Sequence, residues 1–202
     1  MLKTKFQTLC QNFTSDQKLI DSLWQEIEQR HRESTRHYHT LKHLEHTYRV
    51  LPKLDHVTEF AIFYHDIVYD ASRNDNEEQS ALLCEKQLTL LSINSELIQE
   101  TVQLIIETKI HEPSSKRNAL FLDADLAILG ATTEVYGEYT QNVRKEYAIY
   151  GDDVYNKGRQ KVLMHFLEKK RIYMSDYFYE KYEQKARRNL ESEFLSLSRD
   201  SV

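Results

Sequence analysis

The scarcity of glycine and proline is the feature of this sequence that most limits its fold. Only four glycines and two prolines occur in 202 residues. Strands joined by tight turns, and glycine-rich loops that bind phosphate, need more of both residue types. Long helices need neither, and 40% of hydrophobic residues is enough for a sizeable core. We therefore expect an all-α helical bundle that covers residues 1–202 as a single domain.

Hydrophobic periodicity and end signals divide the chain into a series of helices. The expected helices span about 15–32, 40–51, 55–69, 77–91, 95–110 and 119–129, and three more follow, the last starting at Ser175. Pro52 should end the second helix, and Asp55 should cap the start of the third. Gly130 suits the left-handed position that follows a helix.

Bulk properties exclude several classes of protein. No segment approaches the roughly 20 apolar residues of a membrane span, and the first residues lack a signal-peptide pattern. Cys10 and Cys84 are isolated and have no metal-ligand spacing, so we expect free thiols in a cytoplasmic protein. A formal net charge of −5 argues against a dedicated nucleic-acid binder.

The charge is unevenly distributed along the chain. Residues 142–188 hold 12 Lys and Arg against 7 Asp and Glu, a local charge of +5, so the remainder carries −10. This basic segment could supply cations near an anionic substrate, or it could be a set of solvated helix faces. Both interpretations stay open.

Three histidines recur at helical spacing around the start of the expected helix 40–51. On a helical wheel His39, His43 and His46 fall within one narrow arc, opposite an apolar side. Imidazoles on a covered face need hydrogen bonds, anions or a metal ion as partners. For any one of them alone, a purely structural histidine is the better interpretation. The three together favour a site.

An adjacent His-Asp pair lies in the expected helix 55–69. His65 belongs to an apolar stripe at helical spacing, formed by Val57, Phe60, Ala61, Tyr64 and Val68. Asp66 follows it directly, and burying this polar pair is costly unless a partner satisfies both groups. A cation that binds an imidazole nitrogen and a carboxylate oxygen removes that cost.

A further carboxylate falls within an apolar arc of the expected helix 119–129. On the helical wheel Asp125 lies between Phe121 and Leu129, whereas Asp123 points to the flank. We therefore interpret Asp125 as a metal ligand and Asp123 as a solvated or supporting residue.

The order of these residues resembles the HD superfamily of metal-dependent phosphohydrolases, in which a His, a His-Asp pair and a distant Asp lie on separate helices. Tyr38-His39-Thr40-Leu41-Lys42-His43 looks like the Tyr-His-x-x-x-His start of the cyclic-nucleotide phosphodiesterase branch, and Ala124-Asp125-Leu126 resembles its final ligand segment. More closely, the chain is similar to a bacterial group described as predicted metal-dependent HD phosphohydrolases. That similarity is carried by Arg36-His37-Tyr38-His39, Phe63-Tyr64-His65-Asp66, Asn76-Glu77-Glu78-x-Ser80-Ala81, Leu122-Asp123-Ala124-Asp125-Leu126, Arg144-Lys145-Glu146-Tyr147 and Ala186-Arg187-Arg188-Asn189-Leu190.

The resemblance implies an HD-domain-like bundle with one divalent cation bound by His43, His65, Asp66 and Asp125. The ligands would lie within residues 39–125, and helices within 132–198 would complete the pocket. Such nitrogen and oxygen ligands suit Mn²⁺, Fe²⁺, Co²⁺, Ni²⁺ or Zn²⁺, and the sequence does not choose among these or Mg²⁺. A second ion is also compatible with the resemblance.

The implied reaction is hydrolysis of a small phosphate ester, a nucleotide or a related phosphomonoester. Asp66 or Asp125 would accept the proton of the attacking water, and His39 would either protonate the leaving oxygen or contact the phosphate. The chain is shorter than the cyclic-nucleotide phosphodiesterases and shows no purine clamp. Hydrolysis of cyclic nucleotides is therefore not expected.

Several other residues are candidates for the same site. His111 and Glu77 could hold a second ion or contact phosphate, although an exposed histidine at a helix end and an N-terminal helix cap are the alternatives. Arg144, Arg159 and Arg187, with Tyr147, are candidates for binding the substrate, because guanidinium groups bind phosphate through two hydrogen bonds. Arg187 could equally pair with Glu183 one helical turn away.

Two other functions stay open. The chain could be a non-catalytic, metal-containing module of the HD fold that binds nucleotides, or a helical interaction protein without metal. The expected partner is a small phosphorylated molecule rather than a membrane or a nucleic acid. The oligomeric state is not determined, and a homodimer is one possibility.

Overall fold

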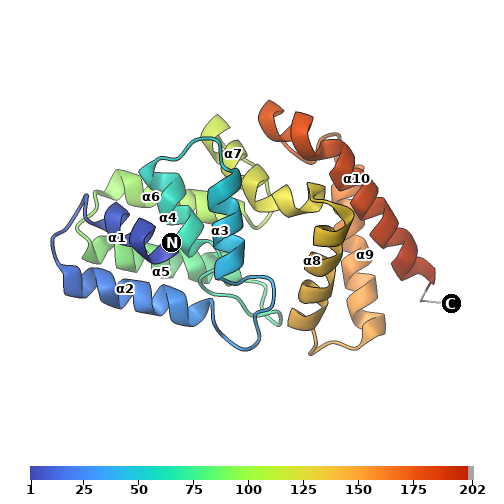
Figure 1. The fold of residues 1–202 in the computed structure, drawn as a ribbon, viewed down its shortest axis with the longest axis horizontal. Coiled ribbons are helices and arrows are strands. Elements are labelled where there is room, and N and C mark those ends of the chain that lie inside the picture. Colours follow the sequence, from blue (N-terminus) through green and yellow to red (C-terminus); the bar gives the residue numbers. More distant parts are fainter. Residues whose placement is uncertain (200–202) are drawn as a thin grey trace. The chain divides into compact units, whose positions relative to one another are not determined.

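The computed structural model describes residues 1–199, and in this part of the chain every regular element is a helix (Figure 1). The expected all-α class is therefore confirmed. The chain divides into two compact units, Met1–Pro113 and Ser114–Val202, and the expected single domain stays a prediction. None of the described helices has both the length and the apolar character that crossing a bilayer requires.

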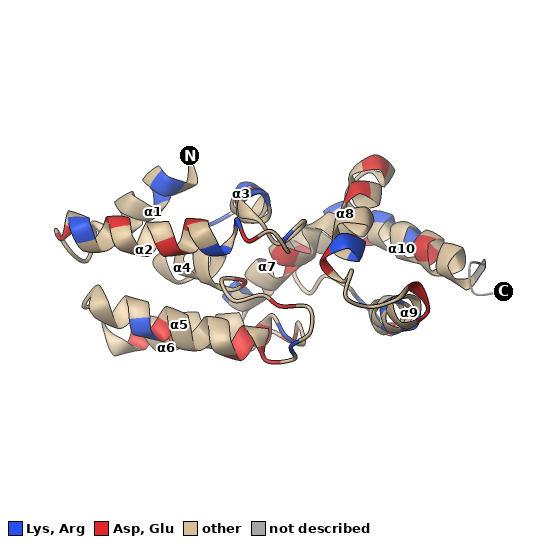
Figure 2. Cartoon of the chain, turned by 90° about the horizontal axis from the view of Figure 1, so that it is seen from below, with Lys and Arg blue, Asp and Glu red and all other residues tan. Residues whose placement is uncertain are grey.

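The first unit is built around one buried helix. Its helices are α1 (Leu2–Cys10), α2 (Gln17–Arg30), α3 (Leu41–Val50), α4 (His56–Tyr64), α5 (Asn76–Leu90) and α6 (Ser95–Glu107). Helix α4 packs against α1, α3, α5 and α6, while α5 and α6 lie side by side (Figure 2). Seven of its nine residues are buried, and Phe60, Ile62 and Phe63 have no exposed surface. Each such side chain stabilises the fold by roughly 1.5–3 kcal/mol.

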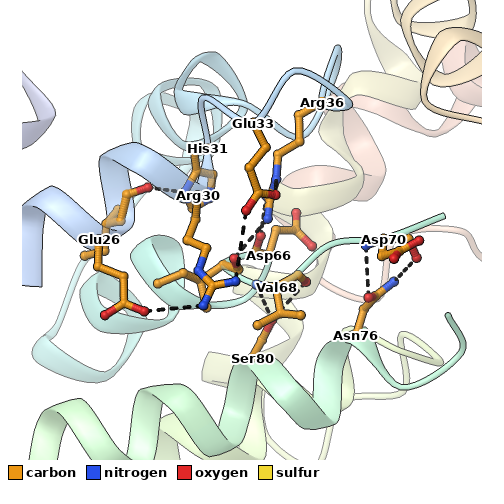
Figure 3. Close-up of polar contacts among 12 residues, drawn as sticks. Glu26, Arg30, His31, Glu33, Arg36, Asp66, Val68, Asp70, Asn76 and Ser80 are labelled. Carbon is orange, nitrogen blue, oxygen red and sulfur yellow. Dashed lines mark hydrogen bonds and ion pairs between the residues drawn. The ribbon is translucent and has the colours of Figure 1, made fainter. Parts of the chain in front are cut away.

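The ends of α4 are set by side chains that satisfy its backbone. Asp55 caps the start as expected, and it forms a reciprocal capping box with Thr58, in which each side chain accepts a hydrogen bond from the other's backbone N–H at 2.9 Å. The helix ends at Tyr64, about five residues earlier than expected. Beyond this point the backbone groups of residues 66–68 are bound by side chains of Arg36 and Ser80 instead of by a further helical turn (Figure 3).

Helix α3 starts at Leu41, after His39, although a helical stripe of His39, His43 and His46 would need His39 inside the helix. Thr40 has an extended backbone and caps the helix through its side chain, which accepts from Lys42 N–H. His39 therefore precedes the helix, and the expectation of one helical stripe through all three histidines is wrong. At the other end the helix stops at Val50, before Pro52, as expected.

The sequence interpretation missed α1. Its buried side chains include Phe6, whose ring meets that of Phe63 edge-on at a centroid distance of 5.1 Å. The helix has only nine residues and no side-chain cap at its start, so the usual end signals are absent. Cys10 in this helix and Cys84 in α5 are buried free thiols, as expected.

The second unit contains a short 3-10 helix that allows close packing. Its helices are α7 (Lys116–Asp125), η1 (Leu126–Gly130), α8 (Thr133–Glu146), α9 (Asp152–Glu168) and α10 (Asp176–Arg199). Gly130 ends η1, and no described glycine has a positive φ, so the expected left-handed position is wrong. The glycine is needed for space: a Cβ at position 130 would lie 2.6 Å from Cβ of Tyr182 on α10.

We expect Gly130→Ala to destabilise the protein by about 1–3 kcal/mol, because the added methyl group forces η1 and α10 apart. Gly158→Ala is the matched control, since a Cβ at Gly158 in α9 would meet nothing within 4 Å. That substitution should stabilise α9 by up to about 1 kcal/mol through helix propensity. Thermal denaturation of both variants checks this contrast, and an equal shift in both would contradict the packing argument.

His31 is a buried histidine at the end of α2. It is 1% exposed, and its Nδ1–H donates a hydrogen bond to the carbonyl of Ile27 at 2.8 Å. Burial, followed by the positive charge of Arg36, lowers the pKa of His31 to about 3, so its imidazole is neutral at physiological pH. In the unfolded chain the same group titrates near its ordinary pKa of 6.5.

The free energy of unfolding should therefore fall as the pH drops below about 6.5, because only the unfolded state then binds a proton at His31. His31 alone should contribute a slope approaching about 1.4 kcal/mol per pH unit between pH 6 and 4. Urea unfolding over this range, compared with His31→Gln, measures the contribution. Identical slopes in the two proteins would exclude a neutral His31 in the folded state.

Candidate metal centre

Three candidate ligands converge within the first unit. His43 on α3 and His65 at the end of α4 are buried, with 3% and 1% of their surface exposed. Their Nε2 atoms lie 2.9 Å apart. One carboxylate oxygen of Asp66, Oδ2, lies 3.1 Å from Nε2 of His65 and 3.3 Å from Nε2 of His43. Two ring nitrogens and one oxygen thus form a compact triangle of possible ligand atoms.

The orientation of His65 follows from its place at the end of α4. Its Nδ1 lies 3.1 Å from the carbonyl oxygens of both Ala61 and Ile62, so Nδ1 carries the proton and donates. In the neutral imidazole, the form that binds a metal, the lone pair is then on Nε2, the atom that faces His43 and Asp66. Backbone carbonyls commonly orient metal-binding imidazoles in this way.

Asp66 is ionised in this environment. Burial by itself raises the pKa of its carboxyl group, but positive charge on the rings of His65 and His39, together with hydrogen bonds from the rings of His43 and His65, outweighs burial and holds the pKa well below the usual value. The side chain keeps 19% of its surface exposed. A carboxylate beside two imidazole nitrogens is a set of ligands that first-row divalent metals accept, so the residues present fit a metal ion of this class.

Asp125 belongs to the second unit, where it is the last residue of α7 and half-buried. It is the fourth candidate ligand, and its role stays a prediction. Of the two interpretations of Asp123, as a solvated or as a supporting residue, the solvated one is wrong. Asp123 is 2% exposed, and its carboxylate accepts hydrogen bonds from the backbone N–H groups of Met174 and Ser175, at 2.9 and 2.7 Å. It thereby holds the segment that leads into α10.

The other two histidines of the predicted stripe have different surroundings. The ring of His39 stacks on that of Tyr69, with centroids 3.9 Å apart, and its centroid lies 5.8 Å from that of His43. His46 is half-buried one turn further along α3, and its Nδ1 lies 3.1 Å from the guanidinium of Arg49. His39 therefore adjoins the triangle, while His46 contacts a residue of its own helix.

Glu77 and His111 both lie in the first unit. Glu77 is half-buried in the first turn of α5, where burial raises its pKa and the negative charge of Asp66 adds to the effect. His111 lies beyond the end of α6, which stops at Glu107 instead of at Ile110 as expected. It adopts a positive φ of 52° and donates its backbone N–H to Glu107. Their roles at a second ion or a phosphate stay predictions.

The three arginines predicted to bind phosphate each contact partners within the second unit. The pairs are Arg144 with Asp152, Arg159 with Glu193 and Arg187 with Glu183, at 2.6, 2.7 and 2.7 Å. The contact of Arg187 with Glu183 one helical turn away, which was the alternative to phosphate binding, is therefore present. Arg187 also donates to three backbone carbonyls of residues 167–170. Tyr147 packs against the rings of Tyr150 and Tyr155. Substrate binding by these residues stays a prediction.

Sequence reasoning missed one residue beside the triangle. Arg36 is buried, and its guanidinium donates to the carbonyl oxygens of Asp66 and Ile67 (Figure 3). It also donates to the carbonyl oxygen of His39. The sequence placed it only in the motif Arg36-His37-Tyr38-His39, and a single arginine there carries no spacing signal. Its partners are backbone atoms, which a sequence pattern does not reveal.

Removing one ligand should abolish tight metal binding. We expect His65→Ala and Asp66→Asn to raise the dissociation constant for Zn²⁺ or Mn²⁺ by more than about tenfold, which corresponds to 1.4 kcal/mol. His165→Ala, which removes an exposed histidine of α9, is the control. Metal content after purification without chelator, followed by titration calorimetry, measures the effect. Full metal content in both ligand variants would rule out the triangle as the binding site.

Comparison of the chain with protein-family models, with curated proteins and with solved structures found no match. Functional inference therefore depends on the arrangement of the residues themselves.

Proposed function

We propose that this protein is a metal-dependent phosphohydrolase of the HD type that acts on a small phosphate ester, a nucleotide or a related phosphomonoester. The observation that carries the proposal is the triangle of His43 Nε2, His65 Nε2 and Asp66 Oδ2, three ligand atoms gathered at the end of a buried helix. We propose Asp125 as the fourth ligand, in agreement with the HD pattern. A pair of neutral structural histidines would not need an adjacent ionised carboxylate in contact with both rings.

The donor set indicates the class of ion. Two imidazole nitrogens with carboxylate oxygens suit Mn²⁺, Fe²⁺, Co²⁺, Ni²⁺ or Zn²⁺, and a ring-nitrogen pair is less suited to Mg²⁺, which prefers oxygen ligands. Such an ion, when bound, polarises a phosphoryl oxygen and makes a water molecule more acidic. The two imidazoles hold the ion without adding charge, and the carboxylates offset its positive charge.

The surrounding side chains supply the remaining chemistry of the proposed reaction. The carboxylate of Asp66 or of Asp125 is proposed to accept the proton of the attacking water. His39 is held by its stack on Tyr69 and lies next to His43. It can donate a proton to the leaving oxygen or hydrogen-bond to the phosphate. The aromatic ring of Tyr69 restrains the plane of the imidazole, which favours a directional role of either kind.

A phosphatase screen tests the proposal. The wild-type protein, loaded separately with Mn²⁺, Co²⁺, Ni²⁺, Zn²⁺ and Mg²⁺, is assayed against nucleoside monophosphates and sugar phosphates. We expect turnover with at least one metal, and a loss of about 100-fold or more in kcat/KM for Asp66→Asn. His165→Ala should retain wild-type activity. Metal binding without turnover in any pairing would instead support a non-catalytic nucleotide-binding module, and the absence of metal binding would support a helical interaction protein.

The role of His39 is tested separately with His39→Gln. If His39 is the general acid, kcat should fall by about 100- to 10,000-fold with little change in KM. If it only binds phosphate, KM should rise while kcat changes little. Unchanged kinetics would remove His39 from the proposed site.

A further inference from the structure

Arg36 is a charged residue placed where charge is costly. It lies in the segment between α2 and α3, and no part of its side chain is exposed. Its nearest carboxylate is Glu33, at 3.3 Å from Nε, which keeps 38% of its own surface exposed. A buried guanidinium needs hydrogen-bond acceptors for its N–H groups, so the identity of those acceptors shows what the residue does.

The acceptors are backbone oxygens of the two segments that flank the ligand triangle. Nη1 donates to the carbonyl of Asp66 at 2.5 Å and to that of His39 at 3.2 Å, and Nη2 donates to the carbonyl of Ile67 at 2.9 Å. One rigid planar group thus joins the loop before α3 to the loop after α4. Three of its bonds end on residues at or next to the candidate site.

The bonds to Asp66 and Ile67 lie at the point where the helix has ended. Two successive carbonyls there have left the helical pattern and need other donors. The forked guanidinium binds both at once, so it restricts the backbone angles that connect them. The direction of the Asp66 side chain depends on those angles. Arg36 therefore acts on the carboxylate through its backbone, without contacting it.

A chain of polar contacts holds Arg36 itself. From Arg36 the contacts run through Glu33, Arg30, Glu26 and Gln87 to Tyr64, and Figure 3 shows the arginine end of this chain. Tyr64 is fully buried and directly precedes His65. One end of this chain of contacts is Tyr64, which directly precedes His65. The other end is Arg36, which binds the backbone of Asp66.

We infer that Arg36 is a positioning residue of the proposed metal centre: its guanidinium holds the backbone of Asp66 and Ile67 so that the Asp66 carboxylate faces His43 and His65. This inference depends on the metal centre in the proposed function. It does not depend on catalysis, because it concerns the geometry of a ligand. A lysine at position 36 keeps the charge but cannot bind two successive carbonyls with one planar group.

The test compares Arg36→Lys with wild type in affinity for Co²⁺ and Zn²⁺, measured by titration calorimetry at a temperature where circular dichroism shows both proteins to be folded. We expect Arg36→Lys to weaken binding about 10- to 100-fold, as is usual when a residue supporting a ligand is lost. The visible absorption of bound Co²⁺ should also change, because it reports coordination geometry. Arg171→Lys is the control: Arg171 binds a carbonyl and a carboxylate within the second unit, and its replacement should leave both readouts unchanged.

A second variant covers the case in which Arg36→Lys does not fold. Glu33→Gln alters a half-exposed partner of Arg36 and leaves the core intact, and we expect it to weaken Co²⁺ binding by a few-fold to about tenfold. Unchanged affinity and an unchanged Co²⁺ spectrum in the folded variants, with only a lower Tm, would overturn the inference and leave Arg36 as a stabilising residue. A wild-type protein that binds none of the metals would overturn the metal centre and this inference together. Metal binding without phosphatase activity would overturn the proposed reaction alone.

Discussion

The burial of α4 is the constraint on which the candidate metal centre depends. Four other helices of the first unit pack around this short apolar helix, and its interior residues are closely enclosed. In a densely packed core the last turn of such a helix cannot shift without disturbing its neighbours. His65 lies at that last turn, and its Nδ1 donates to carbonyls of the same helix. The direction of its Nε2 atom is thus a consequence of the helix position.

The polar groups that follow α4 show how the first unit accommodates a site inside an apolar core. The chain leaves the helix while still buried, so its backbone groups need partners other than water. Arg36 binds two of the carbonyls, and Ser80 on α5 both donates to and accepts from the backbone of Val68. Asp66, whose carboxylate is a candidate ligand, is itself one of these fixed points. The loop is therefore held in place although it has no regular secondary structure.

In the second unit, too, charged side chains bind partners inside the protein. The basic excess of residues 142–188 lies on or near α8, α9 and α10, which also carry acidic residues (Figure 2). Arg159 and Glu193 form a largely buried pair between α9 and α10, with 8% and 10% of their side chains exposed. Breaking such a pair leaves one buried charge uncompensated, which is strongly destabilising. Ion pairs within the second unit are formed by Arg144, Arg159, Arg171 and Arg187, and neither interpretation of the basic segment predicted them.

The sequence by itself determined the fold class, most helix positions and the identity of two candidate ligands. Glycine and proline are too scarce for many tight turns, which favours helices. Asp55 and Pro52 mark helix ends because capping and the loss of a backbone N–H are local effects of single residues, which a sequence pattern reveals. His65 and Asp66 stood out because a polar pair continues an apolar stripe. His43 was identified by its spacing, although the helical stripe that linked it to His39 does not exist.

Only the tertiary structure decided which polar groups meet. Helical wheels place Asp123 on the flank of its helix as a solvated or supporting residue. In the structure it is buried against the backbone that leads into α10, because that segment returns to it from about 50 residues away. Gly130 was read as a left-handed cap, but it serves the close approach of Tyr182, again distant in sequence. Arg36 gave no signal because its partners are main-chain carbonyls about 30 residues further along. A sequence pattern reveals interactions between residues within about one helical turn. Contacts between distant backbone segments form only when the helices pack, so a sequence pattern does not reveal them.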